Sequence, residues 1–365
     1  MVVVAREAGW MLLVAALVLS IGTEAEARRE PVAFEGDYTV PSEARALARF
    51  CRRHNAVTGD LIIGKTWEGV DLKALSCVHS IGGRLVVKRT SALVSLDGLS
   101  LDEQGGVPLR SLRLVDNTAL ADLSSLSSVK GLRTAGLVVQ GNAVLRELSG
   151  LPDLVGGAQV TITDNQSLVT LVVPDGARPG TAIGAVEIAN NPHLESVVGL
   201  ARVTGAATVG VRATPRLRQL SCLPDLSATQ SLELMGLPLL ETWRLAPGIG
   251  SLDRLVVEDV DGTVVLPAMP ELSRVAEVRI VNNDLLESIS GLTITRGGHP
   301  TVDRLVVTDN PRLEAVELQR VVDRLHLPAG DGAVTIQGNA PASSRSPDVK
   351  QKVPDTAGSQ GGGPQ

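Results

Sequence analysis

The sequence predicts a mainly β fold, a β-solenoid of about 11–12 coils with a helical cap at its N-terminal end. A short apolar unit recurs along the chain at spacings of 23 to 29 residues. Each unit opens with alternating apolar residues, the pattern of a short half-buried strand. Only 2% of the residues are aromatic although 44% are hydrophobic. The core must therefore consist of aliphatic side chains, and stacked repeats share such a core along their whole length.

Residues 1–27 have the pattern of an export signal. Arg6 precedes an apolar stretch from Trp10 to Ile21, and Ala25-Glu26-Ala27 follows as a cleavage site. The apolar stretch has 12 residues, fewer than the roughly 20 that a helix needs to cross a membrane. We therefore expect a secreted protein without a membrane span, located in the extracellular space or the periplasm.

Residues 28–58 are expected to form the N-terminal cap segment. Within it, residues 41–50 have the pattern of a short helix with Ser42 as its N-cap. A helix at this place would cover the open end of the first coil, as the ends of solenoids require.

Three cysteines in an exported protein allow one disulfide bond and leave one cysteine over. Cys51 and Cys77 flank the first coil and are 26 residues apart, whereas Cys222 lies far along the chain. We therefore expect a Cys51–Cys77 disulfide that holds the cap to the first coil. Cys222 is expected to be a small core residue, because free cysteines are commonly buried.

Residues 59–340 contain the repeats. The first apolar residues of the units are Leu61, Leu85, Leu112, Leu137, Val160, Val186, Val209, Leu232, Leu255, Val278, Leu305 and Val334. Two further columns, eight and eleven residues after each start, are mostly Leu and are expected to point inward; Trp243 and Val316 fall in the second column. Because one coil cannot bury its own apolar face, neighbouring coils must share a continuous core.

Asparagine recurs five residues after the start of a unit, at Asn117, Asn142, Asn165, Asn191, Asn283, Asn310 and Asn339. Its amide can bond the backbone at a turn, so this column predicts a ladder that satisfies peptide groups between coils. Thr90 and Thr214 take the same place in two units. Leu237 and Val260 interrupt the column, and we expect a bend or slight irregularity of the solenoid there.

Residues 341–365 are rich in Ser, Pro, Gly, Gln and Lys. This composition predicts a disordered tail. Nothing in its sequence decides whether the tail is a tether or an ordinary frayed end.

Outward strand positions provide the candidate binding surface. The residues one and three after the unit starts include Lys88, Arg113, Gln140, Glu187, Arg212, Glu233 and Arg279. Each side chain alone is an ordinary solvated charge, but together they make a long mixed-charge face suited to a protein or polymer ligand. A sugar ligand has little support, since few aromatic residues are available for stacking.

Catalytic and metal chemistry find little support, and no cofactor is predicted. Asp116, Asp164, Asp259 and Asp309 precede the asparagine column, but Gly141, Ala213 and Gly236 separate them. The five histidines are scattered and form no metal-binding motif. The formal charge of −6, without a dense basic block, argues against a nucleic-acid partner.

The segment Cys77-Val78-His79-Ser80-Ile81-Gly82-Gly83-Arg84-Leu85-Val86-Val87, followed by Leu93, Leu96 and Leu99, resembles the receptor L-domain, which forms ligand-binding lobes of insulin and epidermal growth factor receptors. The shared features are an N-terminal cysteine pair, a glycine turn before an alternating strand, and an Asn-x-x-Leu-x-x-Leu return. The resemblance implies a right-handed, leucine-rich-repeat-like β-solenoid that is an extracellular recognition or adhesion module without catalysis. The cysteine-rich module, membrane span and kinase of those receptors have no counterpart here, so receptor signalling is not implied.

The sequence therefore predicts a non-catalytic binding or adhesion module that recognises a ligand on its exposed strand face. A polysaccharide-active β-helix enzyme is the first alternative, because such enzymes share the gross shape. A structural spacer of the cell envelope is the second.

Overall fold

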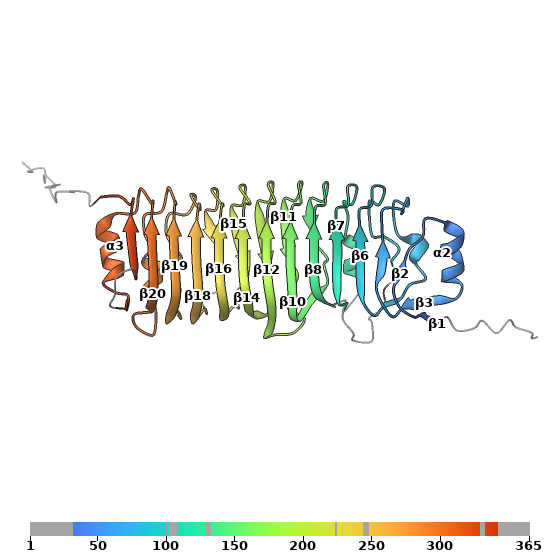
Figure 1. Ribbon diagram of the computed structural model, residues 1–365, viewed down its shortest axis with the longest axis horizontal. Helices are drawn as coiled ribbons and strands as arrows, with labels where there is room; N and C mark the ends of the chain where they lie inside the picture. The colour runs from blue at the N-terminus through green and yellow to red at the C-terminus, as the bar shows by residue number, and fades with distance from the viewer. Residues whose placement is uncertain are drawn as a thin grey trace, which may run out of the picture.

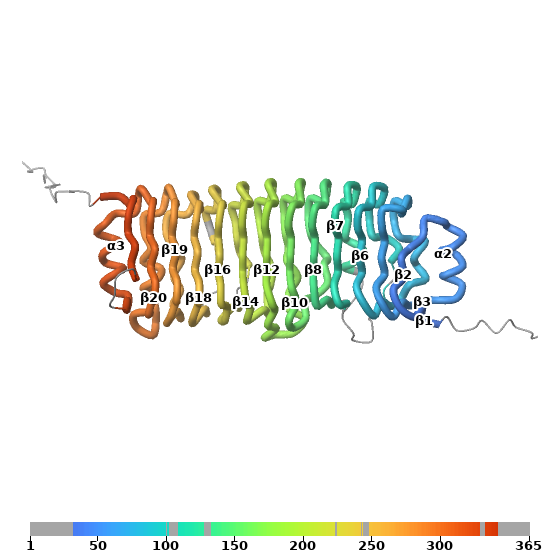
Figure 2. The backbone as a smooth tube through the Cα atoms, in the orientation of Figure 1, coloured from blue at the N-terminus to red at the C-terminus, as the bar shows by residue number. Residues whose placement is uncertain are grey.

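The computed structural model describes residues 32–99, 101, 109–128, 133–222, 225–243, 248–328 and 333–341. The predicted export signal, and the predicted tail beyond residue 341, lie outside these residues. The described chain forms a parallel β-solenoid of about 11 turns, in which successive coils lie side by side along one axis (Figures 1 and 2). The predicted fold class is confirmed.

The main sheet has 13 strands, and every described pairing in it is parallel. Its strands follow one another in chain order, because each coil contributes one strand and the next coil places its own strand alongside. In spatial order they are β2 (Tyr38–Thr39), β4 (Leu61–Ile63), β6 (Arg84–Lys88), β7 (Ser111–Val115), β8 (Arg133–Gln140), β10 (Asp153–Thr163), β12 (Thr181–Ala189), β14 (Val203–Arg212), β16 (Ala228–Met235), β18 (Ser251–Glu258), β19 (Arg274–Val281), β20 (Thr301–Thr308) and β21 (Val334–Gln337).

Two smaller parallel sheets form other sides of the coils. A five-stranded sheet contains β9 (Glu147–Leu148), β11 (Thr170–Val173), β13 (Ser196–Gly199), β15 (Gln219–Cys222) and β17 (Thr242–Trp243). A three-stranded sheet near the N-terminal end contains β1 (Val32–Phe34), β3 (His54–Val57) and β5 (Ser80–Ile81). Short 3-10 turns at Lys73–Leu75, Ser124–Ser128 and Ser290–Leu292 complete some coils.

The core lies between these sheets and is almost entirely aliphatic. Residues at the unit starts from Leu61 to Leu305 are buried, and so are those of the two leucine columns such as Leu168 and Leu171, but Val334, the last predicted start, is 36% exposed. Trp243 is 4% exposed and Cys222 is 1% exposed, so both belong to the core as predicted. The alternation of buried and outward residues along each strand leaves one face of the main sheet available to solvent.

The N-terminal end is covered by α2 (Ala44–Cys51), which buries Leu47 and Phe50 against the first coil. The expected N-cap is wrong: the cap position belongs to Glu43, and no side chain caps the helix. The turn before the helix is extended at Glu43, so the helix begins two residues after Ser42. The predicted Cys51–Cys77 disulfide is present, with 5.5 Å between the Cα atoms.

The C-terminal end carries a second helix, α3 (Ala315–Val322), which the repeat pattern does not predict. It replaces the strand that the second leucine column would form in this coil. Val316 is therefore 43% exposed rather than inward, and Leu318 and Val321 fill the core in its place. The predicted inward position of Val316 is wrong because a helix repeats every 3.6 residues and a strand every two.

The asparagine column is interrupted at Leu237 and Val260 as predicted, and no shift of register accompanies the interruption in the main sheet. Strands β16, β18 and β19 pair without any shift of register. Leu237 and Val260 are fully buried in the asparagine position, so the solenoid accepts an apolar side chain there. No described helix is long and apolar enough to cross a membrane.

Candidate functional site

The strands of the main sheet end in a repeated backbone turn. The residue four after the unit start has a positive φ in coil after coil, at Arg89, Asp116, Gly141, Asp164, Asn190, Ala213, Gly236, Asp259, Asn282, Asp309 and Gly338. Asp, Asn and Gly adopt this left-handed conformation most readily. The spaced aspartates therefore belong to the turn geometry, and catalysis is not needed to explain them.

Asparagine follows seven of these eleven turns, and its side chains form hydrogen-bonded ladders from Asn117 to Asn191 and from Asn283 to Asn339. Asn165 donates from its side-chain amide to the carbonyl oxygen of Val139 at 3.0 Å, and its backbone N–H donates to Oδ1 of Asn191 at 3.0 Å. Asn142 and Asn310 make the corresponding bonds, and Asn117, Asn165, Asn191, Asn283 and Asn310 are all 0% exposed. These bonds fix the ends of the strands, so that the outward side chains stand in straight columns.

The predicted binding residues lie along these columns, which we call the strand face. It consists of the outward side chains one residue before, one after and three after each unit start. Lys88 is exposed on β6, and Arg113 is half-buried on the adjacent strand β7. Gln140, at the end of β8, donates to Oδ2 of Asp164 at 3.3 Å. Glu187, Arg212, Glu233 and Arg279 follow on β12, β14, β16 and β19.

Half of the strand face is internally ion-paired. Glu187, Arg212, Glu233, Arg254, Glu277 and Arg304 alternate in sign, and we call them the ion-pair ladder. Their consecutive N–O distances are 3.8, 2.5, 3.6, 3.4 and 3.5 Å. A separate pair joins Arg279 to Glu258 at 3.1 Å. The structure thus brings three predicted residues together, Glu187, Arg212 and Glu233, and places Arg279 beside them in its own pair.

Glu233 is the central carboxylate of the ion-pair ladder and is 9% exposed. Burial alone would raise its pKa, but hydrogen bonds from Arg212 and Ser231 and the charges of Arg212 and Arg254 lower the pKa below its ordinary value. The Ser231 hydroxyl donates to Oε1 of Glu233 at 3.0 Å. Glu233 therefore stays ionised, and its carboxylate joins Arg212 and Arg254 in the ion-pair ladder.

Sequence reasoning missed three members of the ion-pair ladder, Arg254, Glu277 and Arg304. They occupy the position directly before the unit start, where register pairs Arg254 with Glu277 and Glu277 with Arg304. The sequence contained this information, because the alternation of inward and outward residues along a strand makes the residue before each unit start point outward as well. Arg84 also occupies it and pairs with the buried carboxylate of Asp60 at 2.7 Å.

Lys88 and Arg113 differ from the other predicted cations. Neither has an ion pair or a side-chain hydrogen bond among the described residues, whereas Arg212 and Arg279 are both ion-paired. Val86 lies opposite Arg113 in the register and Val115 opposite Lys88. On β6 and β7 the strand face therefore combines the unpaired cations Lys88 and Arg113 with aliphatic side chains and with the ion-paired Arg84.

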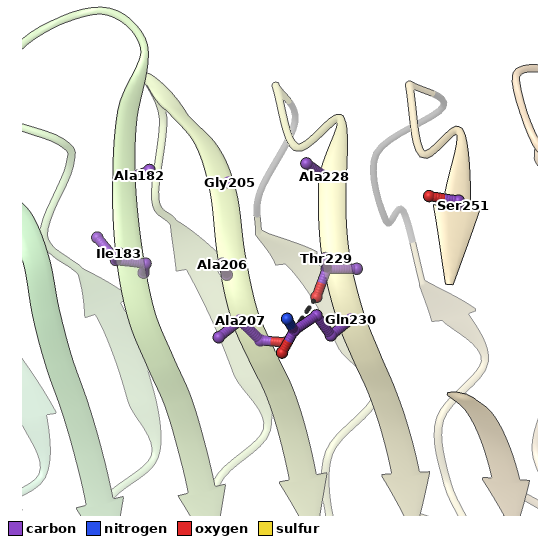
Figure 3. A pocket seen from close by; sticks show the side chains of 9 residues that line it. All are labelled: Ala182, Ile183, Gly205, Ala206, Ala207, Ala228, Thr229, Gln230 and Ser251. Carbon is purple, nitrogen blue, oxygen red and sulfur yellow. Dashed lines mark hydrogen bonds between the residues drawn. The ribbon is translucent and has the colours of Figure 1, made fainter. Parts of the chain in front are cut away.

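The hollows of the surface are shallow. One of about 360 Å³ lies over the first residues of β12, β14, β16 and β18 and is lined mainly by small residues such as Ala182, Gly205 and Ala228 (Figure 3). Thr229 and Gln230 are its main polar side chains. A larger cleft, of about 1060 Å³, lies at the C-terminal end between Val265, Arg312, Glu317 and Arg320. The lining of the first hollow has no carboxylate. The cleft is also lined by Glu287 and Glu314, and in it Arg312 pairs with Glu287 and Arg320 with Glu317, each at 3.8 Å.

Among the described residues, no three His, Cys, Asp or Glu side chains are grouped closely enough to hold a metal ion. Cys222 is a buried thiol, and burial raises its pKa to about 12. No protein-family model matches the chain, and no curated protein matches its sequence significantly.

Proposed function

We propose that the protein is an exported, non-catalytic binding or adhesion module, and that it recognises a protein or polymer ligand on its strand face. The observation that carries this proposal is the geometry of the main sheet. Thirteen parallel strands stay in order along the molecule, and the asparagine ladder bonds neighbouring coils at the strand ends from Asn117 to Asn191 and from Asn283 to Asn339. Such a surface presents a periodic row of side chains to an extended partner.

The chemistry of the strand face supports binding over catalysis. A general acid at neutral pH needs a carboxyl group with a raised pKa, whereas the pKa of Glu233 is lowered. Glu187, Glu258 and Glu277 are each held by an arginine. The polysaccharide-active enzyme therefore has no site on this face that favours it.

The Cys51–Cys77 disulfide supports the export of the protein, since structural disulfides persist in oxidising compartments. A receptor L-domain-like relationship agrees with the parallel solenoid and with this cysteine pair. It remains part of the proposal.

The ion-pair ladder favours a second candidate, a structural spacer of the envelope. Its charges satisfy one another along the solenoid, so this half of the strand face is stable without any ligand. A spacer would use the solenoid as a rigid rod and would bind nothing on the strand face.

A bulky residue in the middle of the strand face tests the two candidates. Thr161 is half-buried on β10 of the main sheet, and Thr170 is exposed on β11 of the five-stranded sheet. Immobilised protein carrying Thr161→Tyr is compared with Thr170→Tyr and the unchanged chain for capture of ligands from surface extract and culture medium. Loss of a ligand only with Thr161→Tyr supports recognition on the strand face. Capture of nothing, or equal capture by all three proteins, contradicts it and favours the spacer.

A further inference from the structure

The cleft at the C-terminal end of the solenoid spans four successive coils, and we call it the end cleft. Val265, Ser288, Val316 and Pro341 line it, and each comes from a different coil. The helix α3 takes the place that flat strands such as β13 have in earlier coils, and its side forms one wall of the end cleft (Figure 1). The volume of about 1060 Å³ is large for a ligand pocket.

Three valines in and beside the end cleft are exposed to solvent. Val265 is 51% exposed, and Val264 and Val316 are both 43% exposed. Covering them with another apolar side chain is favourable, because aliphatic surface is then removed from water. The valines therefore give the end cleft an apolar surface that a docked segment would bury.

The charged residues of the end cleft leave it with an acidic excess. Its lining has two basic and three acidic residues, which gives a formal charge of −1: Arg312, Arg320, Glu287, Glu314 and Glu317. The N–O distances of the Arg312–Glu287 and Arg320–Glu317 pairs are 3.8 Å, longer than the roughly 2.7–3.2 Å of a hydrogen bond. Both carboxylates therefore keep acceptor capacity for a further cation.

The chain itself leads into the end cleft. Ala340 and Pro341, the last described residues, belong to its lining. The backbone N–H of Ala340 donates to the carbonyl oxygen of Leu313 at 3.1 Å, and the N–H of Ala315 donates to the carbonyl oxygen of Ala340 at 3.2 Å. These bonds hold Ala340 alongside the start of α3. The segment that follows Pro341 therefore begins at the end cleft.

Residues 342–353, which we call the proximal tail, have the opposite charge and a matching apolar content. The proximal tail has three basic residues and one acidic residue, which gives a formal charge of +2: Arg345, Lys350, Lys352 and Asp348. Val349 and Val353 flank the two lysines in the sequence Val-Lys-Gln-Lys-Val. A basic segment with two valines complements an acidic cleft with exposed valines in both charge and polarity.

From this complementarity we propose that the end cleft is the docking site of the chain's own proximal tail. Val349 and Val353 cover the exposed valines of the cleft. Lys350 and Lys352 lie beside its glutamates, and Asp348 lies beside one of its arginines. The contact is separate from the strand face, so it goes beyond the proposed binding function.

The length of the proximal tail and its attachment favour this occupant. Twelve extended residues span about 40 Å, whereas four adjacent coils span only about 15 Å. A segment on the same chain is also present at an effective concentration in the millimolar range, so it should fill the end cleft before a second copy does. The disorder that composition predicts beyond residue 340 is then confined to the residues after Val353.

The test is a disulfide trap in the full chain. One variant carries Val265→Cys and Val349→Cys, and the reference variant carries Ile336→Cys and Val349→Cys. Ile336 is 44% exposed on β21 and lies outside the lining of the end cleft. It is much nearer than Val265 to Val349 along the sequence, so an undocked tail would reach it at least as readily. Cys222 is buried and stays in both variants.

Disulfide formation is followed in a glutathione buffer by mass spectrometry of proteolytic fragments. The Val265 variant should form its disulfide within one chain at least about tenfold faster than the reference variant, because docking raises the effective concentration of the two thiols. Neither substitution in the Val265 variant removes a buried side chain, since Val265 is 51% exposed.

A charge change in the proximal tail tests the electrostatic part. Adding Lys350→Glu and Lys352→Glu to the Val265 variant should slow its disulfide to the rate of the reference. The matched control, Lys350→Arg and Lys352→Arg, keeps both charges and should keep the fast rate.

Equal rates for the Val265 and reference variants overturn the proposal. A disulfide that forms mainly between chains overturns it too, because the end cleft then holds a second copy. A fast rate that survives the change of both lysines to glutamate contradicts the charge complementarity on which the proposal depends.

Discussion

The asparagine ladder concentrates stabilising hydrogen bonds in single buried residues. The side-chain amide of Asn165 donates to Val139, Thr163 and Asn191, and its Oδ1 accepts two bonds from Asn142. Asn165→Ala should therefore lower the free energy of unfolding by about 2–4 kcal/mol, because several buried polar groups lose their partners. Urea unfolding followed by circular dichroism measures the loss.

Asn339→Ala is the matched control for that prediction. Asn339 is half-buried at the last rung, where its amide donates to Val307 and its Oδ1 accepts from Asn310. Its substitution should cost less than that of Asn165. Equal losses at the two positions would contradict the ladder as the source of stability.

Thr214 shows what an incomplete rung looks like. It is fully buried in the asparagine position, and its hydroxyl oxygen has no hydrogen-bond partner. Thr214→Asn should raise the melting temperature, because the new amide oxygen would accept from Asn191 as Asn191 accepts from Asn165. Differential scanning calorimetry gives the shift, and a lower melting temperature would show that this coil has no room for the amide.

Cys222 should not react with thiol reagents in the folded protein. It is 1% exposed, and burial raises its pKa to about 12, so the reactive thiolate is scarce at neutral pH. Titration with a disulfide reagent should find no free thiol in the native protein and one after denaturation.

At the scale of the element, the N-terminal cap depends on the disulfide. Cys51 and Cys77 close a loop with a sequence separation of 26, so replacing both by Ser should cost roughly 3.5 kcal/mol in the chain-entropy model. The double variant is compared with the unchanged chain by urea unfolding. Identical unfolding midpoints would mean that α2 holds the first coil by its apolar contacts alone.

The C-terminal helix α3 offers a pair of residues two positions apart with opposite surroundings. Leu318 is 3% exposed and Val316 is 43% exposed. Leu318→Asp should destabilise the protein by about 3 kcal/mol or more, since it buries a charge in the last coil. Val316→Asp should have little effect. Hydrogen exchange of β20 amides should report the difference locally, and equal protection in both variants would contradict the capping role of α3.

At the scale of the whole molecule, stability should fall in acid. The pKa values of Asp60 and Glu233 are lowered despite burial, by hydrogen bonds and charges from Arg84 and from Arg212 respectively. Stabilisation by a group with a lowered pKa is present above its unfolded pKa of about 4 and is lost as the pH falls through the folded pKa. Thermal unfolding between neutral pH and strong acid should therefore show a decline below about pH 4–5.

Glu233→Gln tests the origin of that decline. Loss of the Glu233 carboxylate should make the unfolding temperature fall less steeply as the pH is lowered. An unchanged acid profile in this variant would assign the dependence to other carboxyl groups. Asp153 acts in the opposite sense: burial raises its pKa, so its contribution is present below the unfolded pKa and is lost as the pH rises through the folded value.

The sequence by itself determined the architecture, because a solenoid repeats local information. A residue such as Leu112 or Asn142 has the same environment as its counterparts in neighbouring coils, so periodicity reveals burial directly. The positions of Cys51 and Cys77 at the ends of the first coil were sufficient to predict their disulfide. Most of the inward columns and outward strand positions follow from the period of the repeat, since each coil places equivalent residues in equivalent surroundings. Val316 departs from its column because α3 replaces a strand there.

Only the tertiary structure decided which of the outward charged side chains form ion pairs. Glu187, Arg212 and Glu233 are far apart in the sequence, and their pairing depends on side chains of adjacent coils reaching one another across strands. The pattern treated Arg113 and Arg212 alike, yet the first is unpaired among the described residues and the second belongs to the ion-pair ladder. The form of the C-terminal end also became known only from the tertiary structure, because the helix α3 covers the last coils where the repeat pattern predicts another strand. Local periodicity fixes where a side chain points, but contacts between coils fix what it meets.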